Sequence, residues 1–183
     1  MKTIHILIIF IILALVQLYV PYRMIKDHED ILKYGTLYQF KTKPIDPNDP
    51  FRGKYITLSY EMDSFNSNDT TYYNNNKVYI HLTKDDAGFA QIKGVSHQEP
   101  TEPIDYVEAF IDYNDNGYIR FELPFNRYYM EETKALAAEQ LYQQVNRQDS
   151  IEKVYAMVYV KEGKAVLSDV IIAGESIKDY VTK

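Results

Sequence analysis

The chain begins with one long apolar stretch and continues as a series of short segments in which apolar and polar residues alternate. From Ile4 to Val20 nearly every residue is isoleucine, leucine, valine or phenylalanine. At about 1.5 Å per residue, such a helix just crosses a hydrocarbon core about 30 Å thick, especially with Tyr19 and Tyr22 at the interface. The pattern therefore predicts a transmembrane helix that contacts the lipid bilayer through residues 4–22.

The flanks of this helix indicate how it is used. Lys2 precedes it as a short positive region, which is also how a cleavable signal peptide begins. Its end, from Val16 to Tyr22, offers no pair of small residues for cleavage, so an uncleaved signal anchor is favoured over a removed peptide. Because long domains translocate largely regardless of charge, we expect a single-pass protein whose soluble domain is extracytoplasmic.

The apolar pattern changes to a helical mixture of apolar and charged residues after the predicted span. This mixture covers residues 22–33, and Gly35 follows where a helix would end. We therefore predict a membrane anchor helix with a short stalk over residues 1–33 and one soluble domain over residues 34–183.

Short alternating segments separated by turn residues predict antiparallel hairpins in the soluble domain. The expected strands are 36–43, 53–62, 77–83, 89–95, 104–113, 118–123, 153–160 and 165–173. Residues 64–76 are rich in serine, asparagine, aspartate and threonine, so we expect a mobile loop there. The tail after Gly174 is expected to fray.

One helix is predicted in the soluble part, over residues 131–146. Good helix formers lie between the members of a partial apolar stripe, which consists of Ala135, Leu136, Ala138, Leu141 and Val145. We expect this helix to pack across the sheet. The fold class is therefore α+β, with a transmembrane helix followed by a mainly antiparallel sheet or partly closed barrel and one packed helix.

Composition excludes several classes of function. The net charge is -6 and the basic residues are scattered, so the chain lacks the positive face that nucleic acids require. Cysteine is absent, which excludes disulfides, thiolate metal sites and a cysteine nucleophile. Tyrosine occurs 18 times and tryptophan not at all, a composition that suits half-buried strands.

Three sequence motifs suggest a family. The first has the pattern G-x-Y-x-x-L-x-Y at Gly53, Tyr55, Leu58 and Tyr60, after a proline-rich turn that contains Asp46, Asp49 and Arg52. The second precedes the predicted helix and contains Arg127, Tyr128, Glu131 and Glu132. The third, G-x-A-x-L-x-D, ends at Asp169. Together with the apolar N-terminus, these motifs resemble the GDYXXLXY family of bacterial membrane-anchored proteins.

The resemblance covers nearly the whole chain and departs from the family pattern at Lys54, which replaces an aspartate. It implies an association with a multi-pass membrane protein. We expect a location in the inner, or cytoplasmic, membrane. The family has no established reaction. Our first hypothesis is therefore a non-enzymatic accessory or interaction partner of an integral membrane protein.

The second hypothesis is an extracytoplasmic module that binds a small polar ligand or a cation near Asp46, Asp49 and Arg52. The simpler interpretation of these residues is a turn in which aspartate side chains bond to backbone amides. Tyr55 and Tyr60 lie on opposite faces of their predicted strand. We expect Tyr60 in the core and Tyr55 at the surface or against a partner.

Other candidate chemistry is weak. Asp112, Asn114 and Asn116 have calcium-loop spacing, but Leu123 occupies the position of the required glutamate, so a hairpin is favoured. The four histidines, at positions 5, 28, 81 and 97, show no metal-ligand spacing. Arg127, Glu131 and Glu132 are expected to stabilise a helix N-terminus.

Motif-bearing enzyme classes also lose support, because the chain contains no G-x-S-x-G, H-E-x-x-H or P-loop sequence. We therefore expect no cofactor and no metal, and we favour a non-enzymatic function. A third hypothesis is an unrecognised membrane-bound hydrolase, which would need a catalytic group with a shifted pKa in a pocket.

Overall fold

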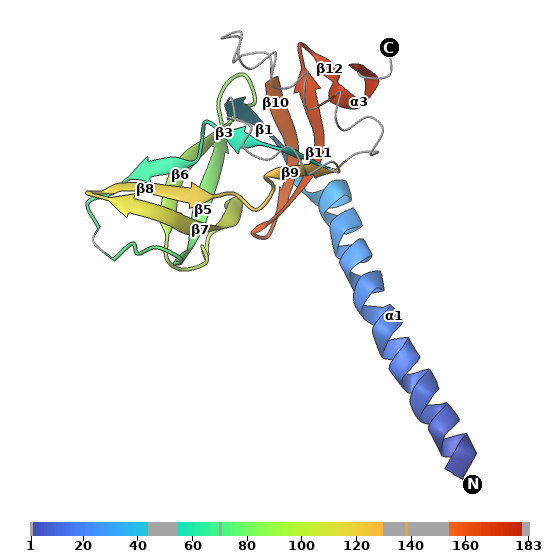
Figure 1. Cartoon of the computed structure of the whole chain (residues 1–183). Coiled ribbons are helices and arrows are strands. Elements are labelled where there is room, and N and C mark those ends of the chain that lie inside the picture. The colour runs from blue at the N-terminus through green and yellow to red at the C-terminus, as the bar shows by residue number, and fades with distance from the viewer. Residues whose placement is uncertain (1, 44–54, 70, 130–137, 139–153, 181–183) are drawn as a thin grey trace.

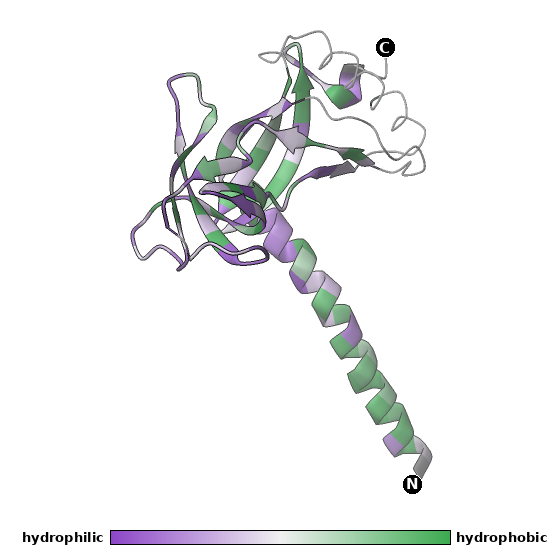
Figure 2. Cartoon of the chain, turned by 60° about the vertical axis from the view of Figure 1, so that its left-hand side comes forward, coloured by the Kyte–Doolittle hydropathy of each residue, from purple (hydrophilic) through white to green (hydrophobic). Residues whose placement is uncertain are grey.

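The computed structural model describes residues 2–43, 55–69, 71–129, 138 and 154–180. The chain begins with one long helix, α1 (Lys2–Tyr34), which projects away from a domain built of strands (Figure 1). By length and composition this helix is able to cross a membrane from Thr3 onward, although an N-terminal signal sequence has the same properties. Most of its apolar side chains are exposed, and Figure 2 shows hydrophobic residues along most of the length of the helix.

Within the described residues, the strands form two five-stranded sheets and one two-stranded ribbon. The first sheet has the order β12-β11-β10-β1-β3, with bounds Glu175–Ser176, Lys164–Ile172, Val154–Lys161, Thr36–Lys43 and Ser59–Tyr60. The second has the order β4-β8-β7-β5-β6, with bounds Ser64–Asn66, Tyr118–Glu122, Tyr106–Asp115, Lys77–Lys84 and Ala90–Ser96. The ribbon pairs β2 (Tyr55–Thr57) with β9 (Arg127–Tyr129).

All paired strands run antiparallel, which confirms the predicted α+β class with a mainly antiparallel β domain. Two isolated parallel bridges, Gln39–Phe89 and Val107–Gly163, connect the two five-stranded sheets. The predicted hairpins at 77–95, 104–123 and 153–173 are all present.

Three sequence predictions are wrong in detail. The expected strand 53–62 is broken at Leu58, because β2 pairs with β9 whereas β3 pairs with β1. The expected loop 64–76 contains β4, which pairs with β8 because Phe65 packs against the core. The expected frayed tail contains β12 and a short helix, α3 (Ile177–Tyr180), because the fully buried Ile177 ties it to the core.

The predicted helix 131–146 lies outside the described residues except for Ala138. That residue is helical and fully buried. Its burial agrees with the prediction that Ala138 belongs to the apolar stripe of this helix.

The core is continuous between the sheets and is rich in aromatic rings. Phe40 is 1% exposed and contacts the rings of Tyr60 and Phe125, with centroid distances of 5.8 and 4.8 Å. The Tyr60 hydroxyl donates to the Phe125 carbonyl over 2.8 Å, which satisfies its one buried polar group. Tyr60 is therefore a core residue, as predicted.

The last turns of α1 are part of the folded domain. The helix ends at Tyr34, directly before Gly35, as predicted. Ile31, in its last turn, is buried. The Lys161 ammonium donates to Asp30 over 2.8 Å and holds the pKa of that carboxyl below its usual range. Lys164 makes a second ion pair, of 3.3 Å, with Asp27. The β10–β11 hairpin therefore fixes the direction in which the helix leaves the domain.

Candidate functional site

The ribbon joins the first two sequence motifs. Tyr55 lies opposite Tyr129, Ile56 opposite Tyr128, and Thr57 opposite Arg127. Sequence reasoning placed Arg127 and Tyr128 at a junction before a helix and did not foresee this pairing. A local pattern does not reveal it, because the two strands are about 70 residues apart in the chain.

The inner side of the ribbon also reaches the third motif. Ile56 and Tyr128 are buried, and the Tyr128 hydroxyl donates to an Asp169 carboxylate oxygen over 2.7 Å. Burial raises the pKa of the Tyr128 hydroxyl, and the hydrogen bond to Asp169 raises it further, so this group stays a proton donor. Leu58 is likewise buried, and its amide donates to the Asn126 carbonyl over 2.8 Å. These residues hold the motifs together in the core.

The outer side of the ribbon carries three further side chains, which we call the ribbon face: Tyr55, Arg127 and Tyr129. The rings of Tyr55 and Tyr129 lie 5.4 Å apart, and the Arg127 guanidinium lies 5.2 Å from the centre of the Tyr55 ring. Tyr129 is 64% exposed. Aromatic and arginine side chains are thus gathered at the surface by the pairing of two motifs.

A trough connects the ribbon face with α1. It consists of two adjoining cavities, of about 560 and 500 Å³. The first lies between α1 and the strands β7 and β8, and the second includes Arg127 and Tyr129. They adjoin because the same four residues line both: His28, Pro124, Asn126 and Ala165.

Charged side chains of both signs and apolar side chains line the trough. Met24, Ile31 and Phe110 contribute apolar surface, and Phe110 is 58% exposed. The charged lining includes Asp27, Glu108, Glu122, Lys164, Arg127 and Lys178. Several of these groups already have partners, since Lys164 pairs with Asp27 and Glu108 with Lys77. Apolar groups and charges of both signs therefore line the same trough.

Several predicted site residues lie outside the described part of the chain: Asp46, Asp49, Arg52, Gly53, Glu131 and Glu132. The hypothesis of a ligand or cation site at the first three therefore stays a prediction. Among the described residues, no group of three or more His, Asp or Glu side chains is arranged to hold a metal ion.

The minor candidates have structural roles where they are described. The segment around Asp112 forms the predicted hairpin, and Asp112 accepts a hydrogen bond of 2.6 Å from Arg120. His81 is half-buried and lies 2.9 Å from the Ser96 hydroxyl, whereas the exposed His97 stacks on the Tyr72 ring.

These features define an α+β protein with one N-terminal apolar helix, able to serve as a membrane anchor or signal sequence, and a β-rich domain whose first two sequence motifs meet in one ribbon. The family model described as "GDYXXLXY protein" matches residues 17–170, which is most of the chain. The protein therefore belongs to the GDYXXLXY family. Comparisons with curated proteins and with solved structures gave no match.

Proposed function

We propose that this protein is a single-pass, non-enzymatic membrane protein whose domain contacts an integral membrane protein. The observation that carries the proposal is the trough, which joins the ribbon face to the helix that is able to enter the bilayer. Tyrosine and arginine are enriched among the residues that contribute most to protein interfaces. Burying Tyr129 and the exposed part of Phe110 against a partner would remove apolar surface from water.

The position of the trough favours a partner in the same membrane. One wall is the last part of α1, directly after the predicted span at residues 4–22. A helix that emerges from the bilayer beside α1 can lie along this wall and reach Arg127 and Tyr129 without bending away. A freely soluble partner would gain nothing from this proximity.

The docked stalk supports an uncleaved anchor. The chain is helical without interruption from the apolar stretch to Tyr34, and Asp27 and Asp30 pair with the β10–β11 hairpin. Cleavage after the apolar stretch would require this ordered helix to open. We infer a bacterial inner-membrane location with the domain on the extracytoplasmic side.

Co-purification tests the proposed partner. The full-length protein would be isolated with a mild detergent from its own host, as wild type and as the double variant Arg127→Ala, Tyr129→Ala. We expect the wild type to recover a stoichiometric multi-pass membrane protein and the double variant to recover at least about tenfold less, because central aromatic and arginine contacts often contribute about 2 kcal/mol or more each.

A matched control removes the same residue types elsewhere. Tyr113 and Arg120 are exposed on β7 and β8, so the variant Arg120→Ala, Tyr113→Ala should retain the partner. Equal recovery by the two double variants would contradict a role for the ribbon face. If no membrane protein accompanies the folded wild type, the partner hypothesis itself is wrong.

A further inference from the structure

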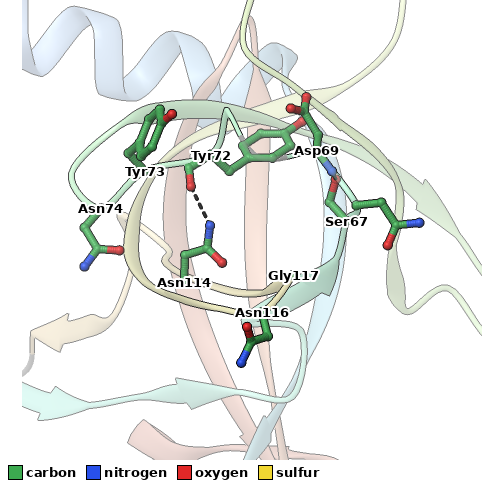
Figure 3. Close-up of a pocket in the computed structure, with 9 residues that line it drawn as sticks. Ser67, Asp69, Tyr72, Tyr73, Asn74, Asn114, Asn116 and Gly117 are labelled. Carbon is green, nitrogen blue, oxygen red and sulfur yellow. Dashed lines mark hydrogen bonds between the residues drawn. The ribbon is translucent and has the colours of Figure 1, made fainter.

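A separate cavity of about 780 Å³ lies at one end of the second sheet (Figure 3). Two chain segments form it: the connection from β4 to β5 and the turn from β7 to β8. Its described lining includes none of the residues that line the trough. Its volume lies within the range of ordinary small-molecule sites.

The lining is dominated by neutral groups that both donate and accept hydrogen bonds. Four asparagine amides and one serine hydroxyl contribute: Asn68, Asn74, Asn114, Asn116 and Ser67. The described lining contains one carboxylate, Asp69, and no lysine or arginine. A phosphate or carboxylate ligand would meet no cation there and would be repelled by Asp69. Hydroxyl groups, by contrast, are matched by amides and by a carboxylate acceptor.

Two tyrosines belong to this polar lining, and one of them, Tyr73, offers an exposed ring. Tyr72 is buried with its ring stacked on His97, at a centroid distance of 4.1 Å and an angle of 21°. Tyr73 is 64% exposed at the rim. The C–H faces of a sugar ring are apolar and pack against aromatic rings, whereas its edges carry hydroxyl groups. The combination of amides and rings therefore matches a carbohydrate better than a purely polar solute.

The walls of the cavity are held in place within the protein. The Ser67 amide donates to the Gly117 carbonyl over 2.9 Å, which ties one segment to the other. The Asn114 amide donates to the Tyr72 carbonyl over 2.5 Å, and Figure 3 shows this contact across the cavity. Asp69 accepts hydrogen bonds from Thr71, which lower the pKa of the carboxyl, so it is ionised at neutral pH. Binding of a ligand would therefore lose little free energy to the ordering of these walls.

We propose that this cavity binds a neutral saccharide, with the asparagine amides and Asp69 bonding its hydroxyls and Tyr73 contacting a ring face. The site is independent of the proposed membrane partner, since the cavity and the trough have separate linings. It gives the domain a second function, recognition of a glycan beside the membrane in which the protein is anchored.

Isothermal titration calorimetry tests the site with three defined probes: maltotriose, cellotriose and chitotriose. The full-length protein would be held in phosphatidylcholine nanodiscs, because glycoside detergents would compete for the cavity. We expect at least one probe to bind, and we expect Asn116→Gly and Tyr73→Ala each to weaken that binding at least about fivefold. Asn116 has a φ of 49°, so glycine removes its amide without straining the turn.

The control variant is Tyr113→Ala, which removes an exposed tyrosine outside the described lining and should leave binding unchanged. Circular dichroism of each variant would show that the fold is retained. The proposal is overturned if none of the three probes binds at about 10 mM. It is equally overturned if binding is insensitive to both cavity variants. A response to Ca²⁺ in place of the saccharides would assign the cavity to a cation instead.

Discussion

Replacing Phe40 with alanine is expected to lower the free energy of unfolding by about 3–5 kcal/mol. Phe40 is 1% exposed, and its ring packs against those of Tyr60 and Phe125, which also contact each other. Alanine would remove this apolar volume and leave a cavity, because the two neighbouring rings belong to different segments and are held by the hydrogen bond between Tyr60 and the Phe125 carbonyl. The loss is a large part of the total stability of a typical domain.

Urea denaturation of the full-length protein in detergent micelles, followed by the near-ultraviolet circular dichroism of its tyrosines, would measure this loss. The matched control is Phe110→Ala, the same substitution at a side chain that is 58% exposed. The control should change the free energy of unfolding by only about 0.5 kcal/mol. Similar losses for the two variants would show that the aromatic cluster is not the stabilising core.

Replacing Gly163 with alanine is expected to lower the free energy of unfolding by about 2–5 kcal/mol. Gly163 has a φ of 78° in the turn of the β10–β11 hairpin, a conformation that costs a residue with a Cβ atom. A Cβ there would lie 2.6 Å from a ring carbon of Tyr106, which is buried and donates a hydrogen bond to Glu99. The ring has little room to move.

The position matters for the whole domain, because Gly163 joins the two sheets. Its carbonyl accepts a hydrogen bond of 3.0 Å from the Glu108 amide. Gly174→Ala is the control: its φ is 88°, but nothing lies within 4 Å of the added Cβ. Only the conformational cost, of about 1–2 kcal/mol, should appear there. The same denaturation experiment would contradict this explanation if both alanines cost the same.

Local patterns in the sequence were sufficient for much of the fold. Alternation predicted a strand over residues 77–83, and Val78, Ile80 and Leu82 form the buried face of β5. Turn residues such as Asn116 and Gly117 located the β7–β8 hairpin, since both adopt positive φ. Hairpins connect neighbours in the chain, so periodicity and turn chemistry determine them almost completely.

Pairing between distant segments was beyond these patterns. The break at Leu58 arises because β2 and β3 have different partners, and neither partner is adjacent in the sequence. β12 and α3 were missed because the burial of Ile177 depends on the finished core.

In the candidate site too, local patterns predicted some features, whereas features that depend on distant contacts were missed. Alternation correctly separated the buried Tyr60 from Tyr55, but the role of Tyr129 was missed. Its signal was the alternation of Arg127, Tyr128 and Tyr129, which indicates a short strand with one buried residue. The trough depends on how α1 docks, and the ion pairs of Asp27 and Asp30 with the distant Lys164 and Lys161 leave no local pattern.

Site-specific photo-crosslinking in the membranes of the native host would examine the proposed contact in place. A photoreactive phenylalanine analogue would replace Tyr129 on the ribbon face or, as the control, Tyr113 on β7. We predict a discrete crosslinked product between position 129 and an integral membrane protein, and no such product from position 113. The absence of a product from position 129, or the same product from both positions, would contradict a role for the ribbon face in binding a membrane partner.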